Sequence, residues 1–176
     1  MKSIKRNNIN KWINKTLLVT ALSFISASAF AQTDTIPPDP GAITVYIVQN
    51  ISFGAFSIGS TGGTVIIATN GARSVTGDVV GLNLGTPYYQ AMFDIDGPQG
   101  AIVSMLNGPD AILTGSNGGS LSMRIGNTDP NSPFIITVIS PARTTVNIGG
   151  ILTVRSTAAN PPGTYNGTFY ITFNQE

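Results

Sequence analysis

The sequence predicts an all-β protein, a single antiparallel β-sandwich that follows a cleaved export signal. The chain contains many short apolar or alternating runs, each bounded by Gly, Pro, Asn or Asp, which is typical of strands and turns. All 20 glycines lie after residue 31, many in Asn-Gly or Gly-Gly pairs that suit tight turns. No helical period is long enough to compete. With no internal repeat and no linker, one sandwich is the simplest architecture.

The N-terminal segment has the features of a secretory signal peptide. Five Lys or Arg residues precede position 16, Leu17–Phe24 is apolar, and Ala29-Phe30-Ala31 is a small-x-small cleavage site. The apolar run 16–31 is shorter than the roughly 20 residues that a membrane-spanning helix needs. We therefore predict a signal peptide at residues 1–31, a flexible Pro-rich leader at 32–41 and the sandwich domain at 42–176. This predicts an exported protein at the cell surface or outside the cell, with the periplasm left open, and no membrane span in the mature chain.

The strands follow one another at short intervals, and we expect some of them to merge. Their predicted ranges, in chain order, are Ala42–Val48, Ile51–Ser57, Thr64–Thr69, Ser74–Val80, Tyr88–Asp96, Ala101–Leu106, Ala111–Thr114, Ser120–Ile125, Phe134–Ile139, Thr144–Ile148, Ile151–Arg155 and Thr164–Asn174.

Alternation within several strands predicts which side chains are buried. Since successive side chains of a strand point to opposite faces, apolar residues two apart define the core face. Tyr165 follows Pro161-Pro162-Gly163 and enters the last strand, where its hydroxyl can bond a backbone group of a crossing loop, as in other sandwiches. The predicted core residues are Phe53, Phe56, Phe93, Ile95, Tyr165, Phe169, Ile171 and Phe173.

Composition argues against an enzyme and against nucleic-acid binding. The chain has no His and no Cys, and every Lys lies within the predicted signal. The remaining four Arg against eight acidic residues give the mature chain a net charge of 4 − 8 = −4, which does not suit a phosphate backbone. A Ser nucleophile has neither His nor Lys to deprotonate it. We predict no catalytic residues, no metal site and no cofactor.

Two carboxylate arrangements are the alternatives to that prediction. Asp94-Ile95-Asp96-Gly97 is similar to the start of a calcium loop, but Pro98, Gln99 and Met105 occupy positions where an EF-hand needs a ligand, Gly and Glu. A hydrolytic carboxylate pair needs two acids within roughly 5–10 Å of each other. The sequence leaves open whether Asp94 or Asp96 meets Asp78.

Four motifs in register resemble the bacterial secreted family named domain of unknown function four-four-zero-two. The resemblance extends from about Ile43 to the C-terminus. It implies an immunoglobulin-like, fimbrial-subunit-like sandwich related to spore-coat U-like proteins, a structural role, and no catalytic residues. Many such subunits carry a Cys pair, which this chain lacks. The motifs are Ile51-Ser52-Phe53-Gly54-Ala55-Phe56, Gly62-Gly63-Thr64-Val65, Ile148-Gly149-Gly150-Ile151-Leu152-Thr153-Val154 and Pro162-Gly163-Thr164-Tyr165-Asn166-Gly167-Thr168-Phe169.

The first strand is the main candidate for a functional segment. Ile43, Val45 and Ile47 alternate with three other residues directly after the leader, so the segment suits addition to an open sheet edge. It is either a strand donated to a neighbouring subunit or the first strand of a self-complete sandwich. The absence of Lys fits a subunit that associates, because Lys commonly protects edges.

The sequence thus predicts a non-enzymatic structural protein, a fimbria-like or pilus-like subunit of the cell surface that associates with itself into a filament or layer. The alternative is a monomeric adhesive or carbohydrate-binding module. In that case Tyr46, Tyr88 and Tyr170, on the less apolar faces of their strands, are the candidates for a sugar-binding surface. Other surface subunits or glycans are the further partners that these two hypotheses allow.

Overall fold

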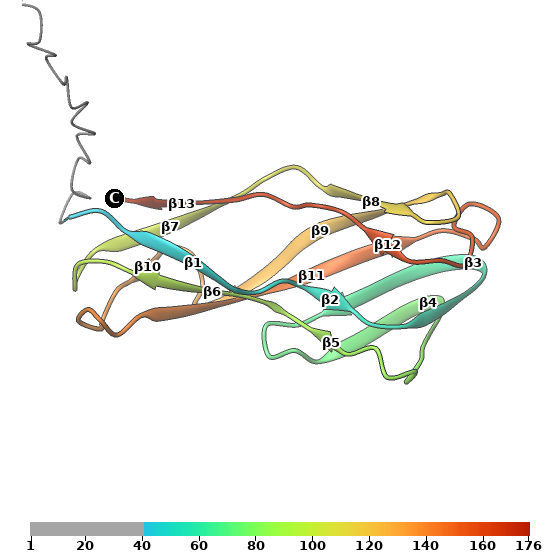
Figure 1. Cartoon of the computed structure of the whole chain (residues 1–176), viewed down its shortest axis with the longest axis horizontal. Coiled ribbons are helices and arrows are strands. Elements are labelled where there is room, and N and C mark those ends of the chain that lie inside the picture. The colour runs from blue at the N-terminus through green and yellow to red at the C-terminus, as the bar shows by residue number, and fades with distance from the viewer. Residues whose placement is uncertain (1–40) are drawn as a thin grey trace, which may run out of the picture. The chain divides into compact units, whose positions relative to one another are not determined.

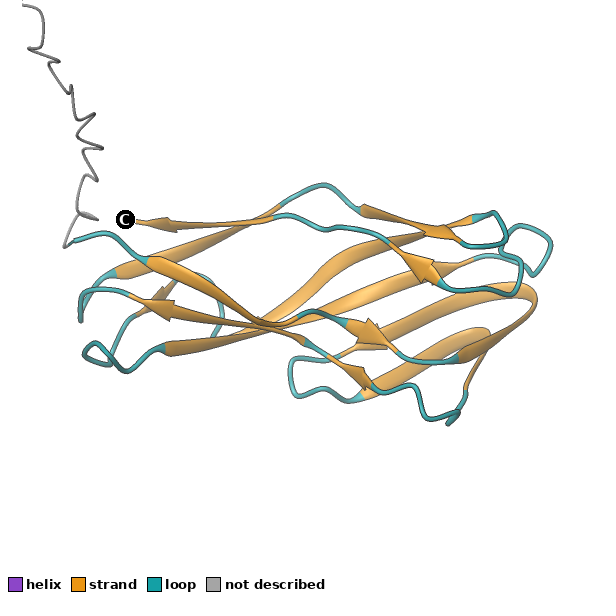
Figure 2. Ribbon diagram, viewed as in Figure 1, coloured by secondary structure: helices purple, strands orange, loops and turns teal. Residues whose placement is uncertain are grey.

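A computed structural model describes residues 41–176, and the predicted signal peptide and most of the predicted leader lie outside the described residues. The described part belongs to one compact unit and consists of strands and loops without a helix (Figures 1 and 2). The prediction of an all-β, antiparallel, sandwich-like fold is confirmed.

Thirteen strands make up the described part of the chain. They are β1 (Thr44–Gln49), β2 (Ser52–Phe53), β3 (Phe56–Ile67), β4 (Arg73–Gly81), β5 (Tyr88–Tyr89), β6 (Ala91–Asp96), β7 (Ile102–Asn107), β8 (Ala111–Gly115), β9 (Ser120–Asp129), β10 (Phe134–Ile135), β11 (Thr144–Val154), β12 (Tyr165–Asn166) and β13 (Ile171–Gln175).

The largest sheet is built around β11. Its order is β1-β6-β11-β9-β8-β12, and β3 also pairs with β11 and carries β4 on its other edge. One edge of β11 bonds β6 along Thr144–Ile148 and then β3 along Gly150–Val154, while β9 pairs with the other edge. The two strands predicted at 144–148 and 151–155 are therefore one, because the chain stays extended where its partner changes.

A three-stranded sheet, β10-β7-β13, and the two-stranded sheet β2-β5 complete the fold. The last predicted strand, Thr164–Asn174, was wrong as a single element. Its first part, β12, pairs with β8 in the large sheet, and its second part, β13, pairs with β7 in the three-stranded sheet. Residues 167–170 connect the two parts (Figure 1).

The predicted Gly62-Gly63 turn lies inside the long strand β3. The pairing register between β3 and β4 shifts between Ile58 and Gly63, so the glycines form an irregularity of the ladder, not the end of a strand. Gly77 on β4 has a φ of 68°, and a Cβ there would lie 2.5 Å from the carbonyl oxygen of Gly62. Only glycine fits so close an approach at positive φ, which places a bulge within the β3–β4 pair.

Two clusters of buried side chains form the core. The first gathers around Val65, Ile67 and Leu152, and the second around Ile95, Val103 and Ile148. Among the predicted core residues, Phe53, Phe93 and Ile95 are buried. Partly buried residues of the predicted set that pack against one or both clusters are Phe56, Tyr165, Phe169, Ile171 and Phe173.

Tyr165 and Asn160 anchor the loop that precedes β12. The Tyr165 hydroxyl donates to the Pro161 carbonyl oxygen at 2.7 Å, so the corner closes mainly on the segment just before Tyr165. Its contact with the crossing loop expected from the sequence is the longer one, 3.5 Å to the Gly118 carbonyl oxygen. The buried Asn160 side chain accepts from the Arg155 amide and donates to the Ser120 carbonyl oxygen, both at 2.7 Å. Because both polar atoms of this buried carboxamide have a partner, the loop is attached firmly to β9.

Candidate strand-edge interface

In the structure, β1 is the edge strand of the chain's own large sheet. It pairs antiparallel with β6 through Val45 opposite Ile95 and Ile47 opposite Phe93, and the register shifts between Ile47 and Gln49. Its other edge has no strand partner within residues 41–176. Of the two arrangements that the sequence left open, this structure adopts the self-complete one.

The inward face of β1 is poorly covered. Residues directly opposite each other in an antiparallel pair share a face of the sheet, so Val45 and Ile47 point the same way as Ile95 and Phe93. Ile95 and Phe93 are 0% and 8% exposed, whereas Val45 and Ile47 are 38% and 69% exposed. The core therefore covers β6 and ends before β1.

Ile43, the third apolar residue of the predicted segment, precedes β1 and is half-buried. It packs against the second core cluster, unlike Val45 and Ile47. The three residues grouped by alternation thus differ in environment: one anchors the start of β1 and two remain exposed.

The second open edge beside this region belongs to β13. Gly108 N–H donates to the Tyr170 carbonyl oxygen, and Glu176 N–H donates to the Ile102 carbonyl oxygen. In this antiparallel ladder the backbone N–H and C=O groups of the even-numbered residues 170–176 therefore point toward β7. The backbone groups of Ile171 and Phe173 therefore point away from β7, toward the free edge.

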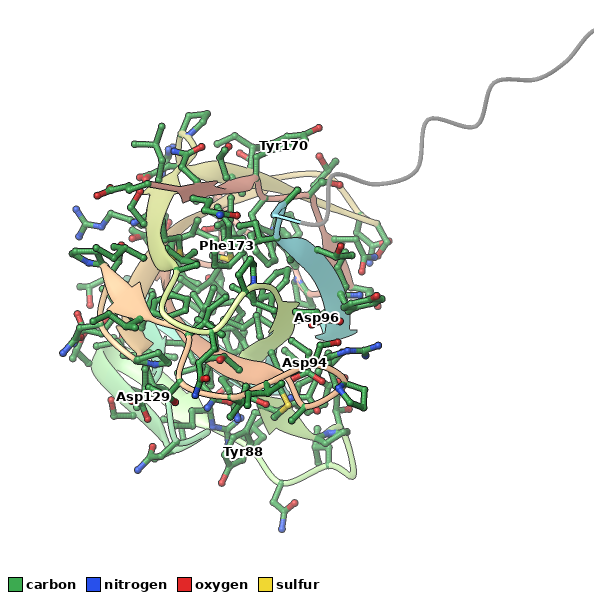
Figure 3. The ribbon with its side chains drawn as sticks, turned by 90° about the vertical axis from the view of Figure 1, so that its left-hand side faces the viewer. Tyr88, Asp94, Asp96, Asp129, Tyr170 and Phe173 are labelled. Atoms are coloured by element: carbon green, nitrogen blue, oxygen red, sulfur yellow. The ribbon has the colours of Figure 1, made fainter. Side chains whose placement is uncertain are left out.

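β13 and β1 border the same part of the core. The Phe173 and Phe93 rings are in contact, with centroids 5.7 Å apart, and Phe93 lies opposite Ile47 on β1. Figures 1 and 3 show β13 and β1 as neighbouring elements at this end of the sandwich. We call the uncovered region between them, defined by Val45, Ile47, Ile171 and Phe173, the β1/β13 seam.

The outer edges of β4, β10 and β12 carry features that discourage pairing. β4 carries the charged residues Arg73 and Asp78. β10 and β12 have two residues each, and Pro133 directly precedes β10. Charges, prolines and short length all protect edges from association. β1 and β13 contain neither a charged residue nor a proline.

A family model described as Domain of unknown function (DUF4402) matches residues 43–174. The chain belongs to this family. The resemblance seen in the four motifs is confirmed, and the matched range of DUF4402 includes all of β1 and most of β13. Both borders of the β1/β13 seam are thus parts of the DUF4402 domain. No curated protein and no solved structure matches the chain.

The three candidate tyrosines of this DUF4402 chain do not form one surface. The Arg143 guanidinium lies 3.7 Å from the Tyr46 ring centroid, and that of Arg73 lies 4.2 Å from the Tyr88 ring centroid, so one face of each ring is occupied. Tyr170 is 68% exposed, and Figure 3 shows it on the opposite side of the domain from Tyr88. A shared sugar platform of the three rings is therefore absent.

The acidic residues are separated as well. Asp94 accepts a hydrogen bond from Thr145 Oγ1 at 2.7 Å, near the start of β11. Asp78 follows Gly77 on β4, and Gly77 pairs with Gly63 on β3. Gly63 in turn pairs with Val154, the last residue of β11. Nine residues of strand correspond to roughly 30 Å, so Asp78 does not meet Asp94 as a carboxylate pair. Within residues 41–176, no three His, Cys, Asp or Glu side chains gather as metal ligands.

No helix in the described residues is long and apolar enough to cross a membrane. The role of Arg73 was missed by sequence reasoning. Its guanidinium donates to the carbonyl oxygens of Phe53, Ala55 and Leu82 at 2.9–3.2 Å. A lone Arg in a strand gives no signal of such contacts, which depend on how β2, β3 and the end of β4 meet.

Proposed function

We propose that the protein is a non-enzymatic, exported structural subunit that associates with itself into a filament or layer through the β1/β13 seam. The predicted signal peptide supports export to the cell surface or beyond. The observation that carries the proposal is the exposure of Val45 and Ile47 on the inward face of an edge strand, while the inward face of its neighbour β6 is buried.

A second copy of the chain is the partner that this surface fits. Pairing along a free edge satisfies the outward-pointing backbone groups of β13, and burial of the apolar side chains supplies the driving force. Complete burial of a Val or Ile side chain contributes about 1.5–3 kcal/mol. Strand addition that covers Val45 and Ile47 therefore adds a few kcal/mol per contact before the cost of association.

The composition supports a structural role. After the predicted signal, the chain carries no His, Cys or Lys, the residues most used as bases, nucleophiles and soft metal ligands. The missing Lys also leaves the edges without their commonest protecting residue. These features suit a subunit whose strands and edges are its working parts.

The test compares two Lys substitutions in the processed chain, residues 32–176. Ile47→Lys places a charge at the β1/β13 seam, and Val80→Lys places one at a similarly exposed position on β4, where the side chain is 59% exposed. Light scattering after size-exclusion chromatography and negative-stain microscopy should find assemblies for the parent and for Val80→Lys. Ile47→Lys should be a folded monomer by circular dichroism.

Two outcomes contradict the proposal. One is a parent chain that stays monomeric at every concentration reached. The other is assembly that survives Ile47→Lys but is lost in Val80→Lys, which would assign the contact to β4 instead.

A further inference from the structure

On another side of the sandwich the two main sheets leave an opening. A depression of about 460 Å³ lies between β7, β9 and the loop that follows β9. Its lining includes Met105, Asn107, Asn127, Thr128, Asn131 and Ser132.

The opening exists because two neighbouring strands are too short to fill it. β10 pairs with β7 only at Ile102 and Val103, and β8 pairs with β9 only along Ser120–Met123. The rest of β7 and of β9 therefore faces the depression without a strand partner on that side. A side chain replaces one missing bond: Met105 N–H donates to Ser132 Oγ at 2.7 Å.

The lining is uncharged, and most of its polar side chains have no partner within the fold. The carboxamides of Asn107, Asn127 and Asn131 have no hydrogen-bond partner among the described residues. By contrast, the Asn147 and Asn160 side chains are bonded within the fold. A carboxamide both donates and accepts, and so does the Thr128 hydroxyl. Residues with free donors and acceptors thus line the depression beside the half-buried Met105.

We infer that this depression binds a neutral saccharide. Sugar hydroxyls need donors and acceptors together, which three carboxamides and a hydroxyl supply, while the Met105 side chain offers an apolar contact for ring C–H groups. No lining residue is charged, so neither a phosphate nor a metal cation is favoured.

The binding is weak for a single site. An open depression buries only part of a ligand, and the interactions must offset the loss of the ligand's freedom, so we expect millimolar affinity. This inference is independent of the self-association proposal, because the β1/β13 seam shares no residue with the depression.

Saturation-transfer difference NMR on the processed chain tests the inference, because it detects millimolar ligands on monomers and assemblies alike. The probes are maltose, lactose and N,N′-diacetylchitobiose, with glucose 6-phosphate as the charged comparison. At least one neutral probe should give a saturable signal at tens of millimolar. The Asn127→Ala/Asn131→Ala variant should bind it about tenfold more weakly, since it loses one to two hydrogen bonds.

Asn166→Ala is the matched control, because Asn166 is an exposed Asn outside the depression. It should bind like the parent. The inference is overturned if none of the three neutral probes gives a saturable signal. It is also overturned if the double variant, with parental circular dichroism, retains full affinity, or if glucose 6-phosphate alone binds.

Discussion

β1 and β4 are both edge strands of the large sheet, yet they present opposite surfaces to a partner. Each exposes apolar side chains, Val45 and Ile47 on one and Val80 on the other. β4 carries Asp78, has its Arg73 bound to three carbonyl oxygens, and pairs with the irregular part of β3 between Ile58 and Gly63. β1 carries no charged residue, and its own pairing with β6 shifts register between Ile47 and Gln49. Exposure alone therefore does not define an interface, and the protection of the edge decides which strand is available.

The largest expected effect is the difference in stability loss between a substitution on the covered strand β6 and one on the uncovered strand β1. Ile95→Ala removes a fully buried side chain and should lower the free energy of unfolding by about 2–5 kcal/mol, because a cavity remains in the second core cluster. Ile47→Ala in the monomer should cost much less, since its side chain is mostly in water. Urea unfolding followed by circular dichroism measures both. Equal losses would mean that β1 is as well covered as β6.

A second substitution tests the close approach between β4 and β3 at Gly77. Gly77→Ala combines positive φ with a contact to the Gly62 carbonyl oxygen and should cost more than the roughly 1–2 kcal/mol of left-handed strain alone. Gly85→Ala is the control, because Gly85 has a φ of 77° and a Cβ added there would meet nothing within 4 Å, so this variant carries only the strain. Thermal unfolding of the two variants should differ. Identical melting temperatures would show that the close approach is easily relieved.

The smallest effect on stability concerns the charge on β4. Asp78 is exposed and accepts weak hydrogen bonds from Ser60 Oγ and the Thr61 amide at 3.4–3.5 Å, so Asp78→Thr should change stability by no more than about 0.5 kcal/mol. Its effect on association is more informative. In an Ile47→Lys background, where the β1/β13 seam is closed, Asp78→Thr should restore some association through β4. A variant that stays monomeric by light scattering would show that the charge of Asp78 is not what protects β4.

The sequence predicted local features well, because alternation and turn residues are local. The faces of Tyr89–Ile95 and Leu121–Ile125 follow directly from their two-residue period. Alternation groups residues on one face but does not tell whether a second sheet covers that face. For this reason Val45 and Ile95 have the same pattern in sequence and opposite burial in the structure.

The remaining features depend on contacts between distant segments. Gly62-Gly63 suits a turn or a bulge equally, and only the pairing with β4 selects the bulge. The depression arises from the lengths over which β8 and β10 pair, so the free carboxamides of Asn127 and Asn131 have no signature in the sequence. The export signal remains a prediction, since it lies outside the described residues.

The shared strand β11 has a mechanical consequence for a subunit under tension. A pulling force applied to β1 along its axis reaches β9 and β3 only through β6 and β11, because these are the bonded neighbours in that order. Antiparallel ladder bonds run perpendicular to the strands, so such a force loads them in shear, and they share the load instead of opening one at a time. We therefore expect high rupture forces for stretching along the strands and low ones for peeling β1 sideways from β6.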